Sequence, residues 1–261
     1  MTRTFTVDAL EVRVFDDLPA LARDAADAAT TAINGAIAAR GDANVMLATG
    51  NSQVAFLADL VRRADVDWTR VTAFHMDEYV GVAAAHPASF QRYMRERFAS
   101  QVPVRTFHYL SGDRGDPEVE ADRYEALLQD HPLDVCCLGI GENGHLAFND
   151  PPVADFADPR AVKVIALEYA SRRQQVGEGH FATVDDVPTH AITVTIPALL
   201  RAARVLVIVP EARKAQPVHD ALRGPITTEC PASILREQAH ATMYLDRDSA
   251  SLLDEPEGRR A

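Results

Sequence analysis

Two acidic residues stand side by side at Asp77 and Glu78, shortly after the apolar segment Val71–Phe74. Neighbouring side chains diverge, so the two carboxylates have different surroundings. One can face a cleft and accept a proton as a general base, while the other accepts hydrogen bonds from the structure around it. A loop of solvated acids is the plain alternative. The pair therefore indicates proton-transfer chemistry at this loop.

A second candidate is His145, in the glycine-rich loop Gly141–Asp150 with the sequence GENGHLAFND. The two glycines before it allow backbone conformations that other residues rarely adopt. A histidine exchanges protons near neutral pH, and Asn143 or Asp150 can fix its tautomer. A single histidine is more often structural, but one framed by glycine, amide and carboxylate at a strand end favours a functional role.

The loop Thr49-Gly50-Asn51-Ser52 joins an apolar segment to a helical one. Backbone N–H groups at a helix N-terminus, together with the helix dipole and two hydroxyls, form a site suited to a phosphate. The loop is neither GxGxxG nor a Walker A sequence, so it indicates neither NAD nor ATP. A tight turn with Ser52 as the helix cap is the plain alternative.

Acidic residues outnumber basic ones in this chain, 38 to 26. The formal net charge is −12, so an anionic ligand needs a local cluster of donors. Arg172, Arg173 and Lys214 are candidates, and Lys214 is one of only two lysines among 26 basic residues. These side chains become phosphate ligands only if they converge on the Thr49 loop. Otherwise they belong to solvated surfaces.

The elements that position these loops alternate between apolar strands and helical segments. We expect strands at Leu10–Phe15, Asn44–Ala48, Val71–Phe74, Leu133–Ile140, Ala161–Leu167, Ala191–Thr195, Arg204–Pro210 and Ala241–Asp246. We expect helices at Asp17–Arg40, Gln53–Arg63, His86–Phe98 and Glu118–Gln129.

Near-continuous apolar strands separated by helices predict an α/β fold with a mostly parallel sheet and helices on both faces. Ligands bind outside the carboxyl ends of the strands in such sheets. That rule selects the loops at 49–53, 75–81, 141–150 and 211–214. The chain has no low-complexity linker, repeat or charge block, so we expect a single domain over residues 1–261.

Composition narrows the function classes. The negative charge argues against a nucleic-acid partner, which a basic face would bind. No apolar run is long enough to cross a bilayer and the N-terminus has no signal pattern, so we expect a cytoplasmic protein without a membrane partner. Cys136, Cys137 and Cys230 have neither disulfide nor zinc spacing, so we expect reduced thiols and no metal.

Three motifs resemble a known family. MDEYVG (Met76–Gly81), HPASF (His86–Phe90) and GENGHLAFNDP (Gly141–Pro151) are similar to the glucosamine-6-phosphate deaminase family, and the resemblance runs from Asn44 to Asp246. The related 6-phosphogluconolactonases share the fold but typically carry GxDGHxAS. Tyr79 and the Ala-Phe-Asn after His145 favour the deaminase branch.

The resemblance implies a Rossmann-like fold, shared with ribose-phosphate isomerase and CoA-transferase-like proteins, and the conversion of glucosamine 6-phosphate to fructose 6-phosphate and ammonia without a cofactor. Asp77 would move the proton between C2 and C1 of the open-chain sugar. His145 would assist ring opening, with Asn143 and Asp150 beside it. The implied ligands of the substrate phosphate are Thr49, Gly50, Asn51, Ser52, Arg173 and Lys214, with Arg173 preferred over Arg172 for its spacing from the Val187–Val194 segment.

This sequence departs from the family pattern beside the histidine. The best-known members have aspartate at the position of Asn143 and glutamate at that of Asp150, and these acids together support an imidazolium. We expect weaker support here, or a contribution from Glu142. Gln53 replaces a common proline. Ala161 stands where regulated members have an arginine near Lys163, so we expect weak or absent regulation by amino sugars.

Two other functions remain open at this stage. On the same scaffold, His145 could activate water for hydrolysis of a phosphogluconolactone. A non-catalytic sugar-phosphate sensor is the second, although such proteins usually carry a basic DNA-binding segment, and this chain keeps both Asp77 and His145. The exact sugar phosphate and the presence of a homo-oligomer are also left open.

Overall fold

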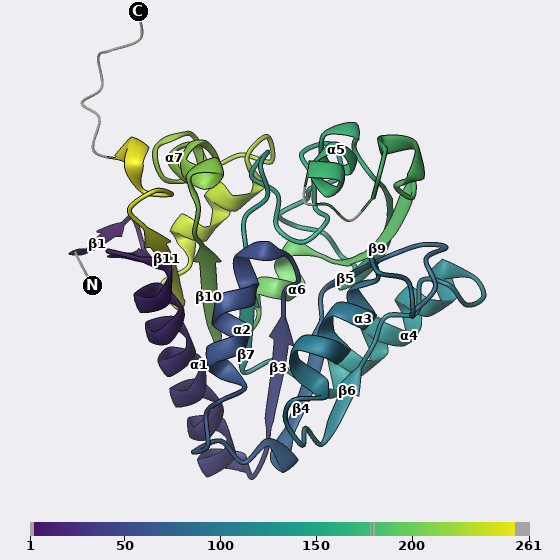
Figure 1. Cartoon of the computed structure of the whole chain (residues 1–261), viewed down its shortest axis with the longest axis horizontal. Coiled ribbons are helices and arrows are strands. Elements are labelled where there is room, and N and C mark those ends of the chain that lie inside the picture. Colours follow the sequence, from purple (N-terminus) through teal and green to yellow (C-terminus); the bar gives the residue numbers. More distant parts are fainter. Residues whose placement is uncertain (1–2, 178, 180, 254–261) are drawn as a thin grey trace, which may run out of the picture.

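Eight strands form the main sheet of the computed structural model, which describes residues 3–177, 179 and 181–253 (Figure 1). The order is β1 (Arg3–Val7), β2 (Leu10–Phe15), β11 (Ala241–Asp246), β10 (Arg204–Val209), β7 (Val135–Leu138), β3 (Ala43–Leu47), β4 (Val71–His75) and β6 (Thr106–His108). The pairing of β1 with β2 is antiparallel and the others are parallel. The mostly parallel sheet predicted from the sequence is confirmed. The predicted domain also contains residues 1, 2, 178, 180 and 254–261, which lie outside the described part.

Helices cover both faces of this sheet, because alternate residues of its buried strands point to opposite sides. Cys136 packs in the core on one face and Cys137 in the core on the other, both as free thiols. The first core includes residues of α4 (Pro117–Asp130), α6 (Ile196–Leu200) and α7 (Ala215–Arg223). The second includes α1 (Leu18–Arg40), α2 (Val54–Leu60) and α3 (Phe90–Met94). In the described residues, no helix is both long and apolar enough to span a membrane.

Helix α1 shows how local sequence sets the element boundaries. The side chain of Asp17 accepts a hydrogen bond from the Ala20 N–H at 2.8 Å and caps the first turn. Gly41 ends the helix in the left-handed conformation, with φ of 91°. Between them, the small side chains of five buried alanines allow close packing on the sheet: Ala22, Ala25, Ala26, Ala29 and Ala36.

A second, antiparallel sheet lies at one end of the main sheet (Figure 1). Its strands are β5 (Asp77–Tyr79), β9 (His190–Val194) and β8 (Val162–Ala166), in that order. The segments at 161–167 and 191–195 are strands as predicted, but they belong to this sheet and not to the parallel one. Apolar runs indicate buried strands without specifying which sheet they join, so this division was missed. Helix α5 (Tyr169–Gly177) follows β8 and packs on the second sheet.

The predicted helix at His86–Phe98 is wrong at its start. Helix α3 begins only at Phe90, because the side chain of Ser89 caps it by accepting a hydrogen bond from the Arg92 N–H. A π-helical turn continues it over Arg95–Ala99. Helix α2 begins one residue later than predicted, after a 3-10 turn at Asn51–Gln53. The short strands β1, β5 and β6 were not predicted.

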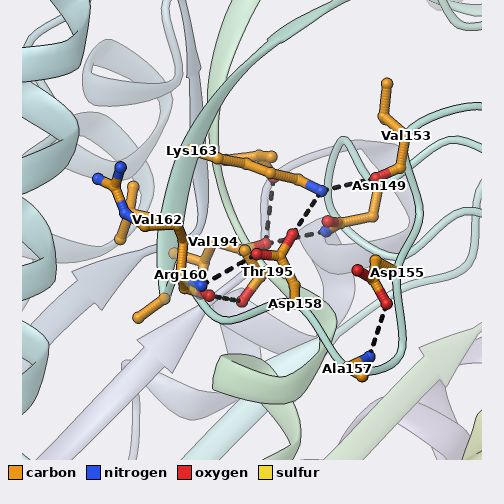
Figure 2. A network of polar contacts seen from close by, with 12 residues as sticks. Asn149, Val153, Asp155, Ala157, Asp158, Arg160, Val162, Lys163, Val194 and Thr195 are labelled. Atoms are coloured by element: carbon orange, nitrogen blue, oxygen red, sulfur yellow. Dashed lines mark hydrogen bonds and ion pairs between the residues drawn. The ribbon is translucent and has the colours of Figure 1, made fainter.

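The loop at 151–160 is held against the second sheet by Lys163 of β8 (Figure 2). Its Nζ donates to the Val153 carbonyl at 2.6 Å and pairs with Asp158 Oδ2 at 2.7 Å. The hydroxyl of Thr195 donates to the Arg160 carbonyl at 2.8 Å on the other side of the loop. Lys163 therefore stabilises the position of this loop on the second sheet.

Candidate active site

The loops after β3, β4, β7 and β10 surround one pocket at the carboxyl ends of these strands, and residues of α5, the helix labelled at the top of Figure 1, also line it. All four of the loops selected from the sequence contribute to it. The predicted site residues that line the pocket are Thr49, Gly50, Asn51, Ser52, Asp77, His145 and Lys214. Asn143 and Asp150 do not line it, but both contact His145.

Asp77 reaches the pocket because the chain leaves the main sheet after His75 and enters the second sheet at once. The Asp77 side chain is buried, and its Oδ1 has no hydrogen-bond partner among the described residues. Burial and then the charge of Glu78 raise the pKa of Asp77 to about 8. A carboxylate held in this way is a stronger base than one in water.

Glu78 points away from the pocket and caps helix α3. Its Oε2 accepts hydrogen bonds from Ser89 Oγ at 2.8 Å and Gln91 N at 2.9 Å, and its Oε1 from Tyr79 N and Phe90 N. Burial raises the pKa of Glu78 to about 7, against these four hydrogen bonds. The two adjacent carboxylates therefore have the separate surroundings that the sequence predicted.

His145 is held by the carboxylate of Asp150. The His145 Nδ1 lies 2.8 Å from Asp150 Oδ1, and the Asn143 amide donates to the same oxygen at 2.8 Å. Burial alone would raise the pKa of Asp150, but the hydrogen bonds to it and the nearby imidazole lower that pKa below its ordinary value. An ionised carboxylate only accepts, so Nδ1 carries a proton and Nε2 is the nitrogen left for proton exchange.

The glycines of this loop are needed where they stand. A Cβ on Gly141 would lie 2.2 Å from ring atoms of His145, so only glycine lets the imidazole rest on the backbone. Gly144 has φ of 82°, a conformation that side chains disfavour. The amide of Asn149 donates to the Leu146 and Val194 carbonyls, which ties the loop to the second sheet.

The phosphate-loop candidate is fixed by its neighbours. The Tyr93 hydroxyl donates to the Gly50 carbonyl at 2.8 Å. Gln53, at the position where the family often has proline, donates to Ser52 Oγ at 3.0 Å and to the Ile208 carbonyl of β10 at 3.2 Å. The glutamine thus links this loop to the end of β10, which is separated from β3 by β7 in the sheet.

Positive charge enters the pocket from the loop after β10. Lys214 is buried and lines the pocket. The half-buried Arg213 also lines it and was not predicted from the sequence. Arg213 Nε donates to Glu211 Oε2 at 2.7 Å, and its NH1 lies 3.5 Å from Glu142 Oε1. Its place next to Lys214, one of only two lysines in the chain, was the signal that could have found it.

Neither arginine of α5 lines the pocket. Arg173 is exposed and lines a neighbouring cavity together with Asn143. Arg172 donates to the Val184 and Val187 carbonyls at 2.6 and 3.0 Å. The structure therefore does not bring Arg173 to the Thr49 loop. The next two residues of α5, Gln174 and Gln175, do line the pocket, and they were not predicted.

No group of three or more His, Cys, Asp or Glu side chains suited to a metal ion occurs in the described residues. The pocket instead combines a loop of backbone donors and hydroxyls, a buried lysine, an isolated carboxylate and a carboxylate-bound histidine. This set is suited to holding an anion while moving protons nearby.

Fold and site together define an α/β protein with its ligand pocket at the carboxyl ends of a mostly parallel sheet. The glucosamine-6-phosphate isomerases/6-phosphogluconolactonase family matches residues 16–244. The chain belongs to this family.

Several relatives are similar over most of their length. The chain is 37% identical to a glucosamine-6-phosphate deaminase of Exiguobacterium sibiricum over 80% of this chain and 81% of the relative. It is 36% identical to one of Listeria welshimeri, over 82% and 89%. A solved monomeric glucosamine-6-phosphate deaminase has a TM-score of 0.83 at 30% identity, over 92% and 99%. A 6-phosphogluconolactonase from Shewanella baltica has a TM-score of 0.75 at 21% identity, over 93% and 98%, which shows the shared fold.

Proposed function

We propose that this protein is a glucosamine-6-phosphate deaminase, converting glucosamine 6-phosphate and water to fructose 6-phosphate and ammonia. The observation that supports it most is the meeting of Asp77, His145 and the Thr49–Ser52 loop in one pocket. The identity of 36–37% to deaminases points the same way. The likeness to the lactonase concerns the fold, so hydrolysis of a lactone is the weaker candidate.

In the proposed reaction the phosphate binds at Thr49–Ser52 and Lys214, with Arg213 beside it. Held there, the phosphate orients the reacting carbons, so binding energy from a remote group contributes to the chemical step. Arg173 was also predicted to bind the phosphate. Because it lies outside the pocket, we give it a smaller part than Lys214.

Asp77 acts as the base that moves the proton between C2 and C1. The C2 proton is weakly acidic, so a buried carboxylate whose Oδ1 has no hydrogen-bond partner in the described part of the chain suits the task. His145 transfers a proton between the ring oxygen and the C1 hydroxyl through Nε2. Asp150 and Asn143 hold the imidazole from behind.

The test is a direct comparison of two substrates. We expect ammonia release from glucosamine 6-phosphate and no acid release above background from 6-phosphogluconolactone. Galactosamine 6-phosphate and unphosphorylated glucosamine serve as controls for sugar and phosphate recognition. Lactone hydrolysis without ammonia release would overturn the proposal.

We also propose that the protein acts in the cytoplasm, on a small sugar phosphate and without nucleic acid. The net charge of −12 and the free thiols support this. Fractionation of cells that express the chain, followed by the ammonia assay on each fraction, tests the location.

A further inference from the structure

Helix α5 presents three polar residues to the loops of the active site. Ser171, Gln174 and Gln175 have the spacing i, i+3, i+4, which puts them on one face of a helix. Gln174 Oε1 accepts a hydrogen bond from the Glu142 N–H at 3.1 Å. Gln175 Oε1 accepts one from the Tyr79 hydroxyl at 2.6 Å. The helix thus contacts both the histidine loop and the strand that carries Asp77.

Ser171 makes the contact nearest to the chemistry. Its side chain is 1% exposed, and its Oγ donates to Asp150 Oδ1 at 2.5 Å. The same Oγ lies 3.2 Å from Nδ1 of His145. The serine lies on α5, whereas its partners His145 and Asp150 lie in the loop after β7, and Asp150 is 21 positions earlier in the chain. It is not part of any sequence motif considered above.

Three donors meet on one oxygen of Asp150. They are His145 Nδ1, Asn143 Nδ2 and Ser171 Oγ, while Oδ2 has no partner among the described residues. Hydrogen bonds from a hydroxyl to a carboxylate are short and strong, and they fix the direction of the carboxylate. A carboxylate turned by this set presents Oδ1 to the imidazole.

We propose that Ser171 is a positioning residue that holds the Asp150 carboxylate against Nδ1 of His145. It acts through Asp150 and does not touch the substrate. With Asn143, it supplies by neutral hydrogen bonds part of the orientation that the best-known relatives obtain from a second acid. Because Ser171 lies on α5, docking of this helix completes the histidine site.

This inference rests on the proposed function for its kinetic test, but not for its spectroscopic one. Replacing Ser171→Ala removes one hydroxyl from a helix that tolerates alanine well. We expect kcat for ammonia release to fall on the order of 10- to 100-fold, as for other residues that orient a functional histidine. KM should stay within about twofold, since the phosphate contacts are untouched.

The second readout is nitrogen NMR of the histidine side chains. In the wild type we expect a protonated, slowly exchanging Nδ1 on His145, identified by its loss in His145→Gln. In Ser171→Ala that proton should exchange faster with solvent. This measurement needs no turnover, so it tests the placement of Ser171 even if the protein releases no ammonia.

Thr195→Val is the matched control. It also removes a buried hydroxyl that donates to a neighbour, the Arg160 carbonyl, but it lies outside the pocket. We expect a lower melting temperature with an unchanged kcat and an unchanged His145 signal. An unchanged kcat and His145 signal in Ser171→Ala, or equal losses in both variants, would overturn the proposal.

Discussion

The replacement of an acid by Asn143 has a structural explanation at the residue scale. The side-chain NH₂ of Asn143 donates to Asp150 Oδ1, and its Oδ1 accepts a hydrogen bond from the backbone N–H of His145 at 3.2 Å. An aspartate at this position would face the Asp150 carboxylate with no proton to donate. The site therefore has one carboxylate, Asp150, that accepts hydrogen bonds from the neutral side chains of Asn143 and Ser171, in place of two acids.

Asn143→Asp should lower kcat for ammonia release, although it introduces the acid that the best-known relatives have. Two carboxylates in contact favour a shared proton, which raises the pKa of the pair. A raised pKa contributes stability at low pH that is lost as the pH rises, so the melting temperature relative to wild type should fall between about pH 5 and 8. Asn143→Ala removes the donor without adding charge and serves as control. A higher kcat in Asn143→Asp than in wild type would contradict this prediction.

Asp77→Asn tests the proposed base. We expect kcat to fall on the order of 10³-fold with sugar-phosphate binding almost unchanged by calorimetry. The pKa of Asp77 is raised to about 8, so the folded state loses stability as the pH climbs from about 4 to 8. The variant should therefore melt at a higher temperature than wild type, and the difference should grow over that range. Equal melting curves at all pH values would contradict the burial effect.

At the scale of elements, the motif MDEY contains both the proposed base, Asp77, and the residue that anchors helix α3, Glu78. The sequence suggested divergent carboxylates, but it did not show what Glu78 contacts. The contact depends on the turn at Pro87–Ser89, where the sequence predicted helix but the observed helix has not yet begun. Propensity alone cannot place such a start, because the cap and the carboxylate that strengthens it come from different elements.

Glu78→Gln should destabilise the protein. The new NH₂ group faces backbone N–H groups or a hydroxyl and loses their hydrogen bonds, which costs on the order of 2 kcal/mol in free energy of unfolding. Chemical denaturation measures this, with the exposed Glu237→Gln as control, expected within about 0.5 kcal/mol of wild type. A Glu78→Gln protein as stable as wild type would show that the cap contributes little.

We expect the loop after β10 to contribute more than helix α5 to binding of the substrate phosphate. Lys214→Ala should raise KM for glucosamine 6-phosphate by at least about tenfold, since it removes a buried cation of the pocket. Arg173→Ala should raise it less, because Arg173 is exposed on the neighbouring cavity. Initial rates over a range of substrate concentrations give both values. The reverse order would return Arg173 to the predicted ligand set.

For the whole molecule, the sequence was informative where a pattern is local. The strand ends, the loops that follow them and the meeting of Asp77 with His145 follow from apolar runs and one rule for parallel sheets. The second sheet was not predicted, because the partners of β9 lie far away in the chain. Ser171 was missed for the same reason, because its role arises from tertiary contacts with Asp150 and His145.

Regulation by amino sugars, which we expect to be weak or absent, is a property of the whole molecule. The contacts of Lys163 are consistent with a structural role for this residue. Its Nζ contacts Val153 and Asp158, which fixes the 151–160 loop (Figure 2). We expect rates of ammonia release to follow a hyperbola that an added non-substrate amino-sugar phosphate does not change. Lys163→Met should lower the melting temperature and leave the rate curve unchanged. A sigmoidal curve that becomes hyperbolic on addition would contradict this expectation.

Gly141 has a consequence for how this chain can vary. Its backbone is in contact with the His145 ring, and any Cβ would overlap it at 2.2 Å. Loops generally accept substitutions more readily than cores do. In a library of single variants selected for activity, position 141 should nevertheless be as intolerant as the centre of a buried strand. Alanine, the smallest change available, should already be lost from the selected population.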